Sequence, residues 1–197
     1  MNSYTLKKVN GAPNWDAIEA LNIDIPYRHE TDVQAWAKLC WDETGIHVNL
    51  RAKEENIRCQ ELEPLSPICE DSCLEFFFAP LADDKRYFNF EWNLLGALYL
   101  GFGAERNTRV RQIVKDVNEL FAPNCFKTAE GWGVEFKIPA SYIQLYMPEF
   151  KLEGEAACNF YKCGDKTDVK HYLAWASLSS EKPDYHRRQD FAKIVFE

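Results

Sequence analysis

Two neighbouring segments with alternating side chains constrain the fold of this chain most strongly. They span residues 73–78 and 87–94, and a strand places every second side chain on the same face. One face is strongly apolar in both segments and consists of Leu74, Phe76, Phe78, Phe88, Phe90, Trp92 and Leu94. The connection between the segments is short, and its Pro, Asp and Lys residues are typical of a turn. The two segments are therefore predicted to form an antiparallel hairpin.

The opposite face of the predicted hairpin brings two acids together. A turn centred near residues 82 and 83 places Glu75 almost opposite Glu91, with Cβ atoms ~5 Å apart. Two bare charges at this distance repel by about 3 kcal/mol at an effective dielectric of about 20. A hydroxyl-rich ligand, a bound cation, a nearby Arg or Lys, or protonation of one acid would offset the repulsion. The alternative is a register shifted by one or two residues, with both carboxylates in solvent.

The rest of the chain repeats the strand pattern and contains no long amphipathic helix. The clearest second hairpin joins residues 31–41 to residues 46–52 through the turn D-E-T-G. Further strands are predicted at residues 4–9, 21–25, 98–102, 131–139, 156–164, 171–178 and 191–196. Brief helical turns are predicted within residues 15–20, 113–121 and 141–146. This pattern predicts an all-β fold, an antiparallel β-sandwich with two or three short helices.

Length and charge limit the organisation and the partners. A chain of 197 residues is expected to form a single domain over residues 1–197. The net charge of −8 argues against nucleic acid and anionic membrane as partners, because both favour a basic surface. The sequence shows no signal peptide, which predicts a cytoplasmic protein. A chain trimmed of its signal would look the same and would be secreted or periplasmic.

Three further sets of residues are interpreted as structural or solvent-exposed rather than functional. The seven cysteines include no C-x-x-C pair, so a zinc ribbon is not expected, and Cys73 and Cys158 are read as buried strand thiols. The basic cluster Arg106, Arg109 and Arg111 is read as the solvated start of a helix rather than as an anion site. Calcium is a candidate ligand for the acidic pairs Asp83 with Asp84 and Asp165 with Asp168, although acids beside turns are commonly just solvated.

A series of sequence blocks resembles the family-9 carbohydrate-binding modules, and more closely the free-standing members than those attached to xylanases. The blocks are D-S-C-L-E-F-F (71–77), F-N-F-E-W-N-L-L-G (88–96), W-G-V-E-F-K-I-P (132–139), N-F-Y-K-C-G-D (159–165), H-Y-L-A-W (171–175) and H-R-R-Q-D-F-A-K-I-V-F (186–196). The resemblance implies a jelly-roll-like β-sandwich with no catalytic activity of its own and a sugar site on one sheet or its rim. Attached members bind glucan or xylan chain ends, cellulose included, and several carry calcium.

The resemblance also assigns roles to single residues. Glu75 matches the acid of the D-S-x-x-E block, which helps to bind sugar hydroxyls, and Glu91 and Tyr161 fall where polar side chains line the same site. The two tryptophans that clamp the sugar in xylanase-attached modules are missing, with Ile68 at one position and His186 close to the other. An aromatic platform supplies the apolar part of sugar affinity. Tyr185 together with His186 is the proposed replacement for one platform, and an outward-facing Trp175 or Trp92 for the other.

The leading hypothesis is a non-catalytic carbohydrate-binding module that supports carbohydrate catabolism and binds an oligo- or polysaccharide. Its predicted ligand-binding residues lie on one strand face or its rim: Glu75, Asn89, Glu91, Asn159, Tyr161, Trp175, His186 and Arg187.

Two alternatives stay open. A glycoside hydrolase would use Glu75 and Glu91, whose ~5 Å separation suits a retaining enzyme, but a flat sheet face lacks the enclosure that raises the pKa of an acid. A haem-binding sandwich of the related redox type would use Met147 and His171.

Overall fold

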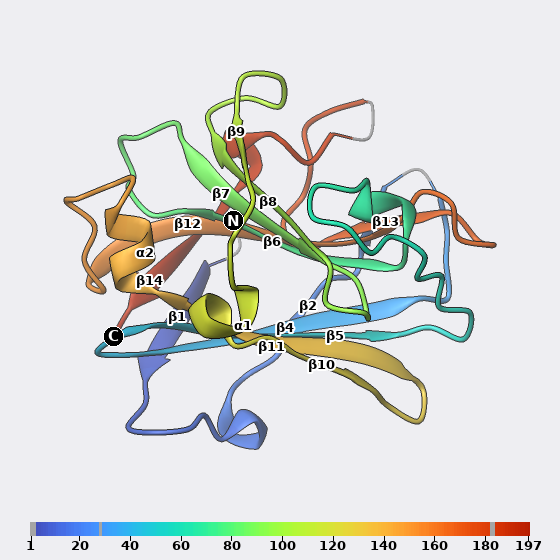
Figure 1. Cartoon of the computed structure of the whole chain (residues 1–197), viewed down its shortest axis with the longest axis horizontal. Coiled ribbons are helices and arrows are strands. Elements are labelled where there is room, and N and C mark those ends of the chain that lie inside the picture. The colour runs from blue at the N-terminus through green and yellow to red at the C-terminus, as the bar shows by residue number, and fades with distance from the viewer. Residues whose placement is uncertain (1–2, 28, 182–183) are drawn as a thin grey trace.

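The chain forms a β-sandwich, as the sequence predicts (Figure 1). The computed structural model describes residues 3–27, 29–181 and 184–197. The first sheet runs in the order β14 (Ala192–Phe196), β12 (Gly154–Gly164), β6 (Cys73–Ala79), β7 (Tyr87–Trp92), β8 (Leu98–Gly103) and β9 (Val110–Gln112), and β13 (His171–Ala174) and β3 (Ile25–Pro26) extend it beside β12. The second sheet runs in the order β10 (Asn124–Lys127), β11 (Gly131–Pro139), β5 (Gly45–Lys53) and β4 (Gln34–Asp42), with β2 (Leu21–Asn22) beside β4.

Both hairpins that the sequence indicates most clearly are confirmed. In the first sheet, β6 and β7 are antiparallel, and Glu75 lies directly opposite Glu91. In the second sheet, β4 and β5 pair over their full lengths around the D-E-T-G turn. The register that places the two acids opposite each other is therefore the observed one, and the shifted register is not.

The first strand joins the two sheets and makes the sandwich mixed rather than purely antiparallel. Strand β1 (Ser3–Lys8) pairs with β14 through residues 3–6 and with β4 through residues 7–8, and both pairings are parallel. Alternation in a sequence predicts that a strand exists, but it does not specify the direction of its neighbours. The expectation of a wholly antiparallel sandwich was wrong at this strand.

The helices are short, as predicted. They are the 3₁₀ turns η1 (Trp15–Ala17), η2 (Ile68–Glu70) and η3 (Arg188–Asp190) and the helices α1 (Val117–Phe121) and α2 (Ala140–Gln144). Asn14 caps η1 by accepting a hydrogen bond from the backbone of Asp16. The helix expected within residues 113–121 covers only the second half of that range. No helix among the described residues is long and apolar enough to cross a membrane.

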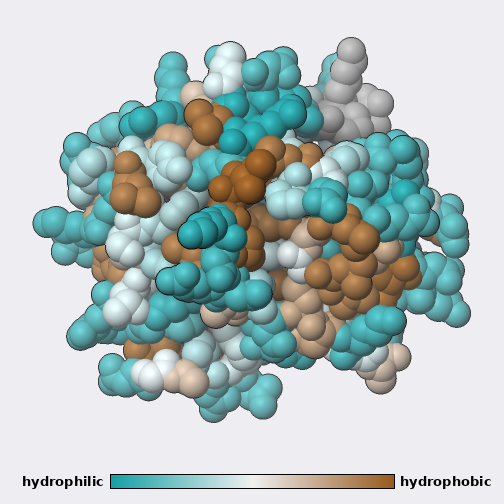
Figure 2. Space-filling model, in the orientation of Figure 1, coloured by the Kyte–Doolittle hydropathy of each residue, from teal (hydrophilic) through white to brown (hydrophobic). Residues whose placement is uncertain are grey.

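The main core lies between the two sheets and contains the apolar face of the β6–β7 hairpin. Phe76 stacks on Phe160 of β12 with ring centroids 4.9 Å apart, and Trp92 packs against Phe136 of β11. Full burial of side chains of this size stabilises the fold by about 2–3 kcal/mol each. Figure 2 shows a mostly hydrophilic surface on the viewed face, with apolar side chains gathered in a few areas.

A second, smaller core covers the other face of the first sheet. Its buried members include Phe77 and Tyr87 from the hairpin, Tyr161 from β12, and Tyr185 from the loop before η3. The loop that carries η2 packs over the same face, where Ile68 is fully buried. The sheet face that carries the acids is therefore enclosed, and the expectation of a flat, open face was wrong.

Candidate functional site

The two opposed acids line a cavity of about 150 Å³ on the covered face of the first sheet. The exposed fractions of Glu75 and Glu91 are only 2% and 7%. The cavity, here called the acid pocket, is lined by Cys69, Glu75, Phe77, Glu91, Arg106, Cys163, Asp165, Tyr172, Tyr185 and His186. Strands β6, β7 and β12 form its floor, and the η2 loop and the loop before η3 cover it. Three of the eight predicted ligand-binding residues, Glu75, Glu91 and His186, meet there.

Burial changes the protonation of the acid pair. The pKa of Glu75 lies well above its usual value, first because the carboxyl group is buried and second because Glu91 is close. Burial also raises the pKa of Glu91, to about 7, against the opposing effects of the Asn89 amide and of Arg109. The amide of Asn89 donates a 2.8 Å hydrogen bond to Glu91. Protonation, one of the four predicted ways to offset the repulsion, is therefore a property of this pair near neutral pH.

The basic cluster lies beside the acid pocket, where the sequence analysis did not place it. Residues 110–112 form β9 rather than a helix start, so that expectation was wrong. Arg106 lines the pocket and pairs with Asp184 at 2.8 Å. Arg109 lies over the ring of Tyr87, 4.5 Å from its centroid, and donates hydrogen bonds to the Tyr87 hydroxyl and to Nδ1 of His186. Burial, then Arg109, lowers the pKa of His186 to about 2, so this imidazole is neutral and accepts.

Two further predicted residues support the pocket from behind. Asn89 orients Glu91 and is itself fully buried. The ring of Tyr161 stacks on that of Tyr185 with centroids 3.9 Å apart and planes 7° apart, and its hydroxyl donates to the carbonyl of Tyr185. Tyr161 therefore positions Tyr185, which lines the pocket where the sequence analysis sought a replacement platform.

The remaining three predicted residues lie away from the acid pocket. Asn159 joins β12 to the chain after β13, because its amide donates to the carbonyl of Ala176 and accepts from the nitrogen of that residue. Trp175 lies in the main core against Phe160. Arg187 pairs with Asp190 at 2.9 Å. None of the three is brought to Glu75 and Glu91.

The sequence did not predict six of the lining residues, namely Cys69, Phe77, Arg106, Cys163, Asp165 and Tyr172. Phe77, Cys163, Asp165 and Tyr172 lie within blocks that carry the family resemblance, and this was the signal that could have found them. Cys69 and Arg106 come from loops, and their positions depend on how those loops fold back over the sheet.

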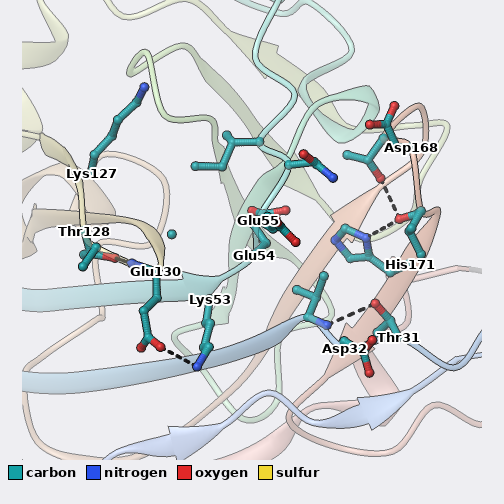
Figure 3. A pocket seen from close by; sticks show the side chains of 17 residues that line it. Thr31, Asp32, Lys53, Glu54, Glu55, Lys127, Thr128, Glu130, Asp168 and His171 are labelled. Atoms are coloured by element: carbon teal, nitrogen blue, oxygen red, sulfur yellow. Dashed lines mark hydrogen bonds and ion pairs between the residues drawn. The ribbon is translucent and has the colours of Figure 1, made fainter.

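A second cavity, of about 600 Å³, lies at the last residue of β5 and the first residues of β11 and β13 (Figure 3). Behind its wall, the fully buried Lys162 pairs with Glu54 at 3.2 Å and donates a 2.8 Å hydrogen bond to Nε2 of His171. Glu54 also accepts hydrogen bonds from Trp132 and Ser72. Burial, then Lys162, lowers the pKa of His171 to about 4. The buried polar groups here satisfy one another, so this network is structural.

The candidate calcium pairs and the haem pair do not form sites of their own. Asp84 is engaged by Arg86 at 2.6 Å, while Asp165 and Asp168 line different cavities. Met147 is buried in the main core, to which His171 does not belong. Both ring nitrogens of His171 already have hydrogen-bond partners. Among the described residues, the group that could hold a metal ion is Cys73, Glu75 and Cys163.

A family model and several solved structures match this chain. The family model for carbohydrate-binding family 9 matches residues 11–196. A candidate carbohydrate-binding protein of Bacteroides uniformis has a similar crystal structure, with a TM-score of 0.85, 26% identity and 99% of each chain covered.

A family-9 module of Caldicellulosiruptor kristjanssonii is also similar. Its complex with cellotriose gives a TM-score of 0.72 at 12% identity, covering 100% of this chain and 94% of that one. Its glucose complex gives 0.70 at 13% identity, covering 100% and 96%. The search of curated proteins found no match. The match over nearly the whole sequence means that this chain belongs to carbohydrate-binding family 9.

Proposed function

We propose that this protein binds carbohydrate without catalysis and that the acid pocket receives the sugar. The observation that carries the proposal is the convergence of Glu75, Glu91 and Asp165 with Arg106 in one cavity beside Tyr172 and Tyr185. Carboxylates accept hydrogen bonds from sugar hydroxyls, a protonated carboxyl group and a guanidinium donate to them, and aromatic rings provide apolar contact. Membership of carbohydrate-binding family 9 supports the same function.

We infer that the preferred ligand is the end of a gluco- or xylo-type chain rather than its middle. The pocket volume of about 150 Å³ corresponds to roughly five water molecules at about 30 Å³ each, and it is below the range of about 300–1,000 Å³ common for larger ligands. A space of this size suits a single sugar unit. The similar Caldicellulosiruptor module, solved with glucose and with cellotriose, supports this choice of sugars.

The first test is a calorimetric titration with glucose, xylose, cello-oligosaccharides and xylo-oligosaccharides. The variants Glu75→Gln and Glu91→Gln keep the side-chain shape but replace a carboxyl group by an amide. A buried polar group left without its hydrogen-bond partner costs about 1–3 kcal/mol, so each variant should weaken binding about fivefold or more. Glu135→Gln is the matched control, since Glu135 also lies within a strand but on the second sheet.

Unchanged affinity in both pocket variants would reject the site. A glycosidase assay with chromogenic substrates accompanies the titration, because the acid pair is enclosed and has raised pKa values. We expect no turnover, and turnover that disappears in Glu75→Gln would contradict the non-catalytic function.

A further inference from the structure

Two thiols and a carboxyl group meet on the floor of the acid pocket. Cys73 and Glu75 are two residues apart on β6 and share a face, and Cys163 on β12 is directly opposite Cys73. The ligand atoms of the three side chains all lie within 4.8 Å of one another, and the Cys163 thiol donates to Glu75 over 2.9 Å. All three residues are at least 98% buried.

This triangle has close to the dimensions of a zinc site. With Zn–S bonds of ~2.3 Å and Zn–O bonds of ~2.1 Å, neighbouring ligand atoms of a tetrahedral ion lie ~3.6–3.8 Å apart. Small rotations of the three side chains would reach these separations, while the paired strands β6 and β12 hold the backbone. Cys69 lines the same pocket, and its backbone carbonyl accepts a 3.7 Å hydrogen bond from the Cys163 thiol, so it holds one edge of the triangle in place.

The charges around the triangle favour a cation. The pocket holds the acids Glu75, Glu91 and Asp165, whereas its one arginine, Arg106, is already paired with Asp184. The hydrogen bond with Cys73 and burial raise the pKa of Cys163 well above its usual value, and burial does the same for Glu75, so a metal that binds here has to displace protons from both.

We propose that Cys73, Cys163 and Glu75 bind a thiolate-preferring divalent cation, with zinc as the expected ion. Two thiolates and one carboxylate are a known type of zinc ligand set, and thiolates disfavour calcium and magnesium. On binding, each thiol and the carboxyl group loses one proton, so one Zn²⁺ replaces up to three H⁺ and leaves the three-ligand site with a charge of −1. The fourth position is left to water or to a ligand that enters the pocket.

The test is a titration of reduced, metal-stripped protein with Co²⁺ in the absence of oxygen and of sugar. We expect a thiolate-to-cobalt charge-transfer absorption that saturates at one equivalent and disappears when Zn²⁺ displaces Co²⁺. A weakly buffered zinc titration should release protons, and the apparent zinc affinity should rise with pH. Failure of wild-type protein to develop the band would overturn the proposal whatever the variants do.

Variants identify the ligands. Cys73→Ala and Cys163→Ala should each abolish the band, and Glu75→Gln should weaken zinc binding at least tenfold. The matched control is Cys158→Ala, because Cys158 is also a fully buried thiol on β12 but faces the main core. A band that persists in both Cys73→Ala and Cys163→Ala would contradict the site, with circular dichroism reporting that each variant is folded. The site shares Glu75 with the proposed sugar site, but its measurement does not depend on sugar.

Discussion

Asn89 determines how Glu91 is presented to the pocket. Its amide donates to Glu91, and its oxygen faces Gly101, the residue directly opposite it on β8. A Cβ atom on Gly101 would lie 2.5 Å from the Asn89 oxygen and 2.9 Å from Nε of Arg109. Two side chains that organise the site therefore occupy the space that a glycine leaves free.

The substitution Gly101→Ala is predicted to weaken sugar binding and to destabilise the protein. The added methyl group displaces Asn89 and Arg109, and overpacking of this kind commonly costs about 1–3 kcal/mol. Thermal unfolding measures the loss of stability, and calorimetry measures the loss of affinity. A variant with unchanged stability and affinity would show that the space above Gly101 is not needed.

At the scale of elements, the loop that carries η2 is held over the pocket by one buried acid. Asp71 is fully buried and accepts hydrogen bonds from the guanidinium of Arg58, from the backbone nitrogens of Gln60 and Glu61, and from the amide of Asn93. These contacts tie the segment that contains Ile68 and Cys69 to the end of β7. The position of the η2 loop over the acid pocket thus depends on a carboxylate outside the pocket.

Replacement of this acid, Asp71→Ala, should loosen the loop. Since hydrogen bonds to a charged group are lost and Arg58 is left without its partner, a destabilisation of about 2–4 kcal/mol is expected. Limited proteolysis should cut within residues 54–70 faster than in the wild type, and sugar affinity should fall. Asp84→Ala is the control, because Asp84 pairs with Arg86 in the turn between β6 and β7 and has no contact with the η2 loop among its hydrogen bonds and ion pairs. Equal proteolysis of the two variants would refute this role of Asp71.

The strands were predictable from the sequence, and the loops that surround the acid pocket were not. Alternation predicted the faces of β6 and β7, and the short turn favoured a register with Glu75 opposite Glu91 but left a shift of one or two residues open until the structure showed the pairing. Cys69 and Arg106 reach the pocket through irregular loops, for which no period exists. Trp175 shows the same limit at a strand end, since alternation there does not tell the main core from the smaller one.

At the scale of the whole molecule, the buried acids and histidines give stability a maximum between acidic and alkaline pH. The folded state keeps the proton of Glu91 up to a pKa of about 7, whereas the unfolded chain releases it near 4.5, so stability falls as pH rises through this interval. His171 acts in the opposite direction. Its folded pKa of about 4 lies below the usual 6.5, so stability falls as pH drops from 6.5 to 4.

The variant Glu91→Gln isolates the alkaline side of this profile. Because Gln resembles the protonated acid and does not titrate, the variant should lose less stability than the wild type between pH 5 and pH 8, by up to about 3 kcal/mol. Urea unfolding at both pH values provides the comparison. Parallel profiles for wild type and variant would mean that Glu91 does not hold its proton in the folded protein.

Strand β1 also determines when this molecule can complete its fold. Ser3 pairs with Lys193, so the two strands that close the first sheet lie at opposite ends of the sequence. During synthesis β1 leaves the ribosome early, yet its neighbour β14 is made only after every other strand. Contacts between such distant segments are costly in loop entropy and slow to form. The first sheet is therefore closed last where β14 pairs with β1 and β12, and until then the edges of β1 and β12 depend on other protection against pairing with neighbouring chains.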